Sequence, residues 1–334
     1  MTQVIQLNSE LPQQESIERA AAIIRSGGLV AFPTETVYGL GADAMNEIAV
    51  RKVFEAKGRP ADNPLIVHVA ERKMLNVIAS DISQKAERLI ETFWPGPLTL
   101  VFKRKPEVAP SVSAGLPTVA ARMPRNAIAS ALIRAAQTPI AAPSANASGR
   151  PSPTTADHVA EDLSGKIDAI LDGGATNIGI ESTVLDVTCD PPRILRPGWV
   201  TREMLTDAVG QIERATSDDE LRRSPGTRHR HYSPRARVIL IERAPAEGLT
   251  ALCEGYLAAG KVGFIGHMPL ALDHANFKAI ILEDSPEDYA RSIYSAFREL
   301  DQGGARVIIV EGISDVGEGA AVMDRLRRAA SETS

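Results

Sequence analysis

Short apolar segments separated by helical stretches constrain the fold of this chain more than any other feature. Before residue 198, segments such as LVAFPT, LIVHVA, LTLVFKR and TVAARMP are rich in branched and aromatic residues, which is typical of strands. The helical stretches between them are irregular, and this pattern favours one α/β domain with a mixed sheet. From Arg237 onwards, RVILIE, KVGFIG, KAIILE and RVIIVEG alternate with helical stretches. That alternation predicts a second, smaller domain whose parallel sheet is covered on both faces.

The change of pattern predicts two domains that are joined by a linker. A length of 334 residues fits two domains of about 150 residues each. We expect the first domain over 1–205, the linker over 206–236 and the second domain over 237–334. Residues 222–237, RRSPGTRHRHYSPRAR, carry six arginines and two histidines without an acid. A solvated spacer is the ordinary explanation of a charge run, but the tyrosine and the prolines of this one favour a functional segment.

Charge and cysteine usage exclude several classes of protein. The net charge of −5 argues against a general polyanion binder, so any phosphate site must be local. Cys189 and Cys253 lie far apart and have no zinc-ligand spacing, which favours a reducing compartment. The N-terminal residues do not resemble a signal peptide, and no apolar run approaches the roughly 18 residues of a membrane span. We therefore expect a cytoplasmic protein.

Polar residues gather where the predicted strands end, and loops at strand ends are where binding groups collect. The segment FPTETVYGLG (32–41) follows a buried strand directly. In KGRPADNPL, Lys57 and Arg59 lie two residues apart and can converge on one anion, although cations also complement a helix C-terminus. In PSANASGRPSP (143–153), small polar residues can offer N–H groups to a phosphate, although such clusters are more often ordinary turns.

Single charged residues inside strands are the next candidates. Arg122 in TVAARMP is costly to bury without an anionic partner, and its guanidinium suits a carboxylate. His68 in LIVHVA is more often a core histidine, Ser182 fits plain strand chemistry, and Arg196 fits a surface position. The sequence has no GxxxxGK[ST], dinucleotide fingerprint, HExxH or GxSxG motif. A nucleotide would therefore be bound by another device.

Taken together, these segments resemble a known family. GGLVAFPTETVYGLG, KGRPADNPL, WPGPLTLV, PSANASG, ESTVLD and LRPG are similar, in order and spacing, to the YrdC-like family of threonylcarbamoyl-AMP synthases, over residues 15–205. SPGTRHRHYSP and the α/β segment after it resemble the long form of that family. The resemblance implies a YrdC-like mixed twisted sheet and a smaller Rossmann-like parallel α/β domain.

The resemblance also implies a reaction and a set of binding residues. The family's nucleotidyltransferases join L-threonine, bicarbonate or CO2, and ATP with Mg2+ into threonylcarbamoyl-AMP and pyrophosphate, and downstream threonylcarbamoyl transferase proteins use that product to modify tRNA. Around threonine the resemblance places Thr36, His68, Arg122 and Ser182. Around ATP it places Lys57, Arg59, Asn63, Thr118, Ala142, Ser144, Asn146, Ser152, Arg196 and Tyr232.

Two alternative functions stay open at this point. The same fold family includes proteins linked to RNA, so an RNA-binding module or a weak direct contact with tRNA is compatible with the resemblance. A carbamoyltransferase is the second alternative. No residue is assigned as a general acid or base, and Mg2+ is expected to be held through the phosphates, so catalysis is expected to rest on positioning and electrostatics. We expect the basic linker to form a lid over the ATP site, because its prolines lower the entropy lost on docking.

Overall fold

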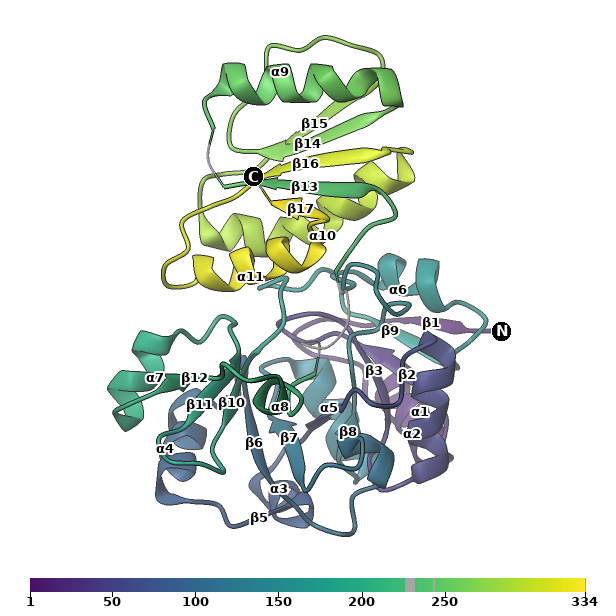
Figure 1. The fold of residues 1–334 in the computed structure, drawn as a ribbon. Helices are drawn as coiled ribbons and strands as arrows, with labels where there is room; N and C mark the ends of the chain where they lie inside the picture. The colour runs from purple at the N-terminus through teal and green to yellow at the C-terminus, as the bar shows by residue number, and fades with distance from the viewer. Residues whose placement is uncertain (226–231, 243, 334) are drawn as a thin grey trace. The chain divides into compact units, whose positions relative to one another are not determined.

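The computed structural model describes residues 1–225, 232–242 and 244–333 (Figure 1). These residues form two compact units. Of the described residues, the first unit holds 1–148 and 153–225, and the second holds 149–152, 232–242 and 244–333. Each unit is an α/β structure with its own sheet. The predicted fold class, a mixed twisted sheet with a second, smaller parallel α/β domain, is confirmed.

The first unit is built on one mixed sheet of 12 strands. Eleven of them follow the order β1-β9-β2-β3-β8-β4-β7-β6-β10-β11-β12, and β5 pairs with β6. The strands are β1 (Gln3–Gln6), β2 (Val30–Phe32), β3 (Gly39–Asp43), β4 (Ile66–His68), β5 (Ala79–Ser80), β6 (Leu98–Arg104), β7 (Thr118–Arg122), β8 (Ile140–Ala141), β9 (Ala169–Asp172), β10 (Thr183–Asp186), β11 (Arg193–Arg196) and β12 (Glu213–Arg214).

Five helices of the first unit, α2, α4, α5, α6 and α7, begin at a residue whose side chain accepts a hydrogen bond from the first turn. Asn46 caps α2 by accepting hydrogen bonds from the N–H groups of Ile48 and Ala49, and Gly58 ends that helix with a φ of 61°. The elements are α1 (Gln14–Arg25), α2 (Glu47–Lys57), α3 (Arg72–Ile78), α4 (Gln84–Phe93), α5 (Ala127–Ala136), α6 (Ala156–Leu163), α7 (Arg202–Val209), α8 (Asp218–Leu221) and the 3-10 turn η1 (Pro110–Ser113).

Strand directions bring residues from distant parts of the chain to one end of the sheet. β4 and β7 run parallel, with His68 in register with Arg122. β6 runs antiparallel to β7, and β10 runs parallel to β6 with Thr183 beside Leu98. The ends of β4 and β7 therefore lie at the edge where β6 and β10 begin. Side chains at these four termini converge.

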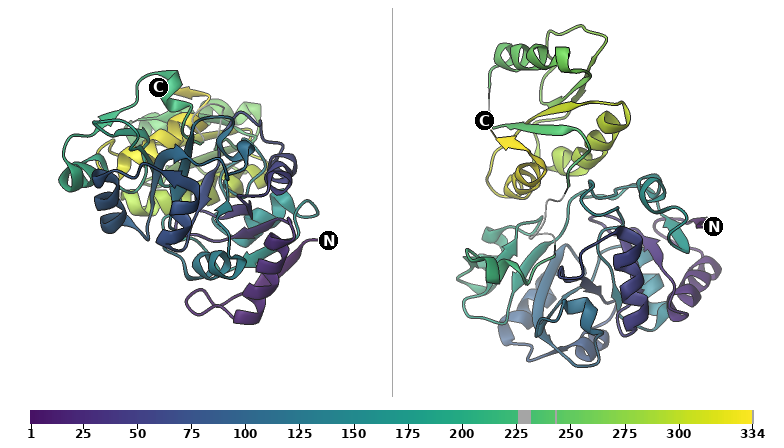
Figure 2. Two further views of the ribbon diagram at one scale, coloured as in Figure 1. Left: turned by 90° about the horizontal axis from the view of Figure 1, so that it is seen from below. Right: turned by 45° about the vertical axis from the view of Figure 1, so that its right-hand side comes forward.

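The second unit has a sheet of five parallel strands in the order β15-β14-β16-β13-β17. Ile239, Phe264 and Ile309 on one face pack with Leu249 and Cys253 of α9, and Figure 2 shows α10 and α11 on the other face. The elements are β13 (Arg237–Ile241), α9 (Ala246–Tyr256), η2 (Leu257–Ala259), β14 (Val262–Gly266), β15 (Phe277–Ile281), α10 (Pro286–Gln302), β16 (Val307–Glu311), α11 (Gly319–Ala329) and β17 (Glu332–Thr333).

The region that we expected to begin the linker is structured in its first half. Residues 206–225 carry the end of α7, β12 and α8, and they belong to the first unit. Arg193 of β11 forms ion pairs with Glu213 and Glu220, and Arg223 pairs with the buried Asp186. These ion pairs hold the segment against β10 and β11. We expected the linker to begin at residue 206, but residues 206–225 are a folded part of the first unit.

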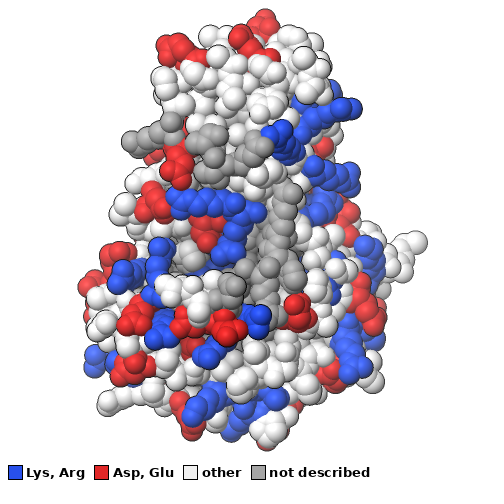
Figure 3. Space-filling model, in the orientation of Figure 1, with Lys and Arg blue, Asp and Glu red and all other residues white. Residues whose placement is uncertain are grey.

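Charges of both signs are interspersed on the face drawn in Figure 3. This distribution agrees with the small net charge of −5. In the ranges that the structure describes, no helix is both long and apolar enough to cross a lipid bilayer.

Candidate functional site

Arg122 is the centre of a buried polar cluster at the end of β7. Its guanidinium is only 3% exposed. Nε donates to the carbonyl oxygen of Gly96 at 3.1 Å, and Nη1 donates to Oγ1 of Thr36 at 2.8 Å. A guanidinium has five N–H groups, and the hydrogen bonds to Gly96 and Thr36 engage two of them. Nη2 faces Glu35 as an ion pair but forms no hydrogen bond of good geometry with the residues that the structure describes. The η nitrogens therefore keep N–H groups for a ligand, which is the arrangement that recognises a carboxylate.

Glu35 supplies the charge that allows Arg122 to be buried. Its Oε2 lies 2.5 Å from Nη2 of Arg122, and its side chain is 6% exposed. The backbone carbonyl of Glu35 accepts from the N–H of Ile178, and that of Thr36 accepts from Gly179. The sequence around Glu35 gives no sign that it is buried. The signal that points to it is indirect: a buried arginine requires an anionic partner, and Glu35 is the acid of the FPTETVYGLG segment.

His68 lies beside Arg122 at the end of the neighbouring strand. Its ring meets the Phe32 ring edge-on, with centroids 6.0 Å apart. Burial, reinforced by the positive charge of Arg122, lowers the pKa of His68 from 6.5 to about 3. The ring is therefore neutral near pH 7. Its buried Nδ1 has no hydrogen-bond partner among the residues that the structure describes. A neutral ring with an unused nitrogen suits a hydroxyl group of a ligand.

Ser182 joins this cluster at the start of β10, and Arg196 holds it there. Oγ of Ser182 lies 2.8 Å from Oγ1 of Thr99 on β6. Arg196, the last residue of β11, donates from Nε and Nη2 to the carbonyl oxygen of Ser182, and from Nη1 to that of Pro225 at 3.0 Å. Through these contacts the buried Arg196 fixes the backbone at Ser182. Its predicted contact with ATP stays a prediction.

Lys57, at the C-terminal end of α2, organises a second cluster. Its Nζ donates to the carbonyl oxygen of Ser144 at 2.6 Å, to that of Asn146, and to Oδ1 of Asn146 at 3.5 Å. Oγ of Ser144 donates to the same Oδ1 at 2.5 Å. The side chain of Lys57 is buried. Its charge is therefore placed under the 144–146 loop, whose shape it fixes.

The segment between β2 and β3 borders both clusters. Thr36 contacts Arg122 on one side. On the other side, Gly39 bridges to Ser144, and the carbonyl oxygen of Tyr38 accepts from the N–H of Ala145. The density of polar residues in FPTETVYGLG thus has a structural explanation, because one short segment lines two neighbouring groups of predicted binding residues.

Other predicted ATP residues of the first unit lie around β4 and β7. Arg59 donates to the carbonyl oxygens of Asn63 and Pro64, just before β4. Ala142 is bonded through its N–H to Ile66 of β4. Thr118 is the first residue of β7, whereas Arg122 is the last. A strand rises about 3.3 Å per residue, which separates these two ends of β7 by roughly 13 Å. The strand therefore does not bring Thr118 to its Arg122 end.

Ser152 and Tyr232 belong to the second unit. Ser152 is fully buried. The Tyr232 ring stacks on Tyr294, with centroids 5.6 Å apart, and Arg325 lies over its ring at 5.5 Å. Tyr232 has a φ of 66° and is 5% exposed, so its ring is packed within this unit. Both histidines of the predicted lid and two of its six arginines, Arg228 and Arg230, fall on 226–231, which lie outside the described residues.

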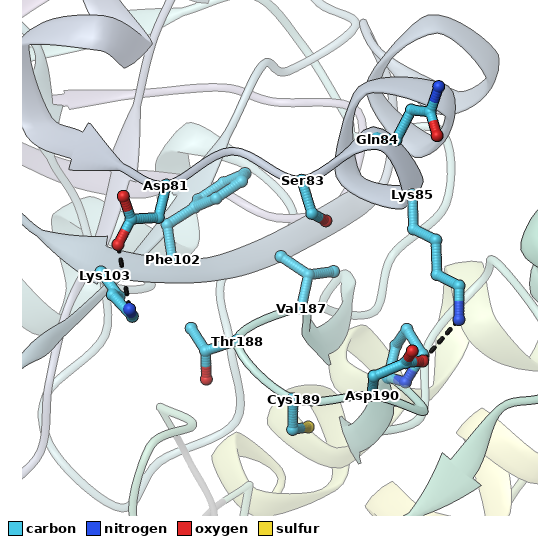
Figure 4. A pocket seen from close by; sticks show the side chains of 11 residues that line it. Asp81, Ser83, Gln84, Lys85, Phe102, Lys103, Val187, Thr188, Cys189 and Asp190 are labelled. Carbon is cyan, nitrogen blue, oxygen red and sulfur yellow. Dashed lines mark hydrogen bonds and ion pairs between the residues drawn. The ribbon is translucent and has the colours of Figure 1, made fainter.

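A pocket of about 460 Å³ lies at the opposite ends of β6 and β10, away from Ser182 (Figure 4). Its two lysines are both paired: Lys103 with Asp81 at 2.9 Å, and Lys85 with Asp190 at 2.5 Å. Paired lysines leave no net charge for an anion, so we do not assign this pocket to a phosphate. Within the described ranges no group of three His, Cys, Asp or Glu side chains is arranged to hold a metal ion.

Comparison with known protein families identifies both halves of the chain. The profile of the Sua5/YciO/YrdC family, described as telomere recombination, matches residues 22–198. The profile described as threonylcarbamoyl-AMP synthase, C-terminal domain, matches residues 200–331.

Individual relatives match over almost the whole length. A threonylcarbamoyl-AMP synthase of Pyrococcus abyssi is 46% identical, with 98% of each chain covered. One of Bacillus subtilis is 46% identical over 97% of this chain and 95% of the relative. The crystal structure of the Pyrococcus abyssi Sua5 protein complexed with L-threonine superposes with a TM-score of 0.94, at 46% identity and with 100% of both chains covered.

The buried state of His68 predicts how stability depends on pH. The pKa of His68 is lower in the folded protein than in the unfolded chain. Below pH 6.5 the imidazole is therefore protonated in the unfolded chain, whereas in the folded protein it stays neutral down to about pH 3. The free energy of unfolding should therefore fall with falling pH, by up to about 1.4 kcal/mol per pH unit from this group. Denaturation of wild type and His68→Gln between pH 7 and pH 5 measures it. Equal slopes for the two proteins would contradict the assignment.

Gly198 predicts a second, steric effect. A Cβ at this position would lie 2.2 Å from the backbone N of Thr183 and 2.5 Å from the carbonyl carbon of Ser182. Gly198→Ala should therefore lower the free energy of unfolding by about 1–3 kcal/mol, as overpacking does. Thermal unfolding measures the loss. Gly255→Ala is the matched control, because nothing lies within 4 Å of its added Cβ; an equal loss in both variants would refute the steric explanation.

Proposed function

The chain belongs to the Sua5/YciO/YrdC family, in which its near-full-length relatives are threonylcarbamoyl-AMP synthases, and from this premise we propose the reaction that it catalyses. It is a nucleotidyltransferase that joins L-threonine, bicarbonate or CO2, and ATP into threonylcarbamoyl-AMP and pyrophosphate. The product supplies threonylcarbamoylation of adenosine in tRNA by downstream transferase proteins in the cytoplasm.

The observation that supports this proposal best is the unused hydrogen-bonding capacity around Arg122. Buried polar groups are normally paired, yet Nη2 of Arg122, Nδ1 of His68 and both carboxylate oxygens of Glu35 find no hydrogen-bond partner in the described part of the chain. Such groups at strand ends fit a small ligand with several polar substituents. L-threonine has a carboxylate for Arg122, a hydroxyl for His68 or Ser182, and an amine.

The second cluster supports ATP as the partner substrate. The 144–146 loop, with Ser144 and Asn146, follows β8, and Lys57 places a buried positive charge beneath it. Backbone N–H groups of such loops bind phosphates. We propose that Lys57 acts mainly by fixing this loop, because its three N–H groups are directed at loop oxygens. Arg59, which is half-buried on the turn after α2, then contacts the phosphates directly.

The reaction needs the two substrates to meet in the correct geometry. The threonine ammonium group loses a proton to water, the free amine adds to CO2, and a second proton is released as the carbamate forms. One carbamate oxygen then bonds to the α-phosphorus of ATP as the bond to the β-phosphate oxygen breaks and pyrophosphate leaves. Two anions repel each other as they approach, so positive charge at the phosphates lowers the barrier. We propose that Mg2+ arrives with ATP, held through its phosphates, and neutralises part of that charge when bound. The residues of this chain hold the reactants in place and supply the remaining positive charge.

The expected activity is pyrophosphate release that depends on L-threonine and bicarbonate together. The full-length chain is incubated with ATP, Mg2+ and bicarbonate plus L-threonine, L-serine or L-alanine, and pyrophosphate is measured. Release should be fastest with threonine and should fall to background without bicarbonate. Equal release with alanine, or without bicarbonate, would refute the proposal. Release of carbamoyl transfer products from carbamoyl phosphate in the absence of threonine would favour a carbamoyltransferase instead.

The assignment of Arg122 to the threonine carboxylate predicts a loss of affinity on Arg122→Lys. Lysine keeps the charge next to Glu35 but loses the planar fork. Threonine binding, measured by calorimetry, should weaken by about 1.5–3 kcal/mol, the range for a hydrogen bond to a charged group. Arg125→Lys is the control, because Arg125 is exposed and its Nε donates to the backbone carbonyl oxygen of Pro95. Unchanged threonine affinity in Arg122→Lys would leave Arg122 with a purely structural role.

A further inference from the structure

Glu35 has more acceptor capacity than the described part of the protein uses. A carboxylate offers about four lone-pair sites. One oxygen of Glu35 faces Nη2 of Arg122 at 2.5 Å, and neither oxygen receives a well-formed hydrogen bond from the residues that the structure describes. The side chain is nevertheless 6% exposed. The backbone on either side is tightly held, because Thr34 Oγ1 donates to the carbonyl oxygen of Val37 at 2.7 Å.

A buried carboxylate with unused lone pairs is energetically costly. Its ion pair with Arg122 offsets part of the desolvation penalty, and the offset is complete only when further hydrogen bonds satisfy both ions. A cationic donor is the strongest partner for the remaining lone pairs. In the cluster around Arg122, His68 cannot provide that cation near pH 7, because its pKa is lowered to about 3. The missing donor is therefore expected to come with a ligand.

We propose that Glu35 binds the α-ammonium group of the amino-acid substrate while Arg122 binds its α-carboxylate. This inference rests on the proposed function and deepens it. An amino acid presents a cation and an anion on one carbon atom, and Glu35 and Arg122 present the opposite charges side by side. Two complementary pairs bury no net charge, so the site accepts a zwitterion at little electrostatic cost. Glu35 is thus a specificity-determining residue that selects for an amine.

The alternative role for Glu35 is to position Arg122 without touching the substrate. The two roles differ in which ligand they favour. A positioning residue affects every ligand that Arg122 binds through a carboxylate. A residue that binds the ammonium affects only ligands that have one. Comparing threonine with its α-hydroxy analogue, in which a hydroxyl replaces the ammonium group, separates these effects.

The experiment measures the affinities of both ligands for the full-length chain by calorimetry. The proteins are wild type, Glu35→Gln, Glu35→Asp and the control Glu91→Gln, since Glu91 is an exposed residue of α4. Wild type and Glu91→Gln should prefer threonine over the hydroxy analogue to the same extent. Glu35→Gln should lose about tenfold or more of that preference, as expected for a lost charged hydrogen bond. Binding of the hydroxy analogue should change less than binding of threonine.

Equal weakening of both ligands in Glu35→Gln would overturn the inference and leave Glu35 as a positioning residue. If Glu35→Gln does not fold, Glu35→Asp decides, because it keeps the charge next to Arg122 and withdraws the carboxylate by one methylene group. A reduced preference in Glu35→Asp supports the inference, and a wild-type preference overturns it. The proposed function fails separately, if wild type shows no threonine-dependent pyrophosphate release. The inference alone is refuted if wild type releases pyrophosphate with threonine but Glu35→Gln still prefers threonine over the hydroxy analogue as wild type does.

Discussion

The buried ion pair between Arg122 and Glu35 is the constraint on which the rest of the site depends. Removing a guanidinium and a carboxylate from water costs several kcal/mol for each ion, so the pair persists only where the surrounding segments are all in place. Arg122 closes β7, Glu35 follows β2, and Gly96, which precedes β6, accepts from Nε. Three segments that are far apart in the sequence must therefore meet before the charge is satisfied. The same meeting places His68 and Ser182 nearby, through the register of β4 with β7 and of β10 with β6.

Strand and helix patterns were readable from the sequence because apolar periodicity is a local property. The mixed sheet of the first unit and the parallel sheet of the second follow from such patterns, and the helix end at Gly58 follows from its capping chemistry. Arg122 was recognisable because an arginine in an apolar strand needs a partner. Its first partner, however, comes from the chain itself. Glu35 gave no local signal of burial, since a carboxylate in a polar loop is ordinarily solvated, and only tertiary packing buries it.

Lys57 and Arg196 show a second limit of reading cations from sequence. The resemblance places both around ATP, and both donate to backbone carbonyl oxygens of the chain, Lys57 to Ser144 and Arg196 to Ser182. Their contacts with ATP stay predictions. A sequence shows that a loop contains a cation, but it does not show how many unpaired carbonyl groups that loop turns inward. Turns that break a sheet leave such carbonyls, and a buried cation satisfies them while keeping its charge. A lysine of this kind shapes the loop and still contributes to the local electrostatic potential.

The charge balance of the Arg122 cluster also bears on where the carbamate moves after it forms in the proposed reaction. With His68 neutral, Arg122 and Glu35 cancel each other, so a zwitterionic amino acid leaves the cluster neutral. Carbamate formation with CO2 then releases two protons from the ammonium group to water and leaves a second carboxylate-like anion bonded to that nitrogen. An anion next to the Glu35 carboxylate is repelled by like charge, whereas the 144–146 loop has the buried cation of Lys57 beneath it. The β2–β3 segment borders both clusters through Thr36 and Gly39. If Glu35 binds the ammonium group as we propose, loss of that charge drives the carbamate away from Glu35 and towards the side on which the triphosphate is expected. On this proposal the first chemical step orients the nucleophile for the second.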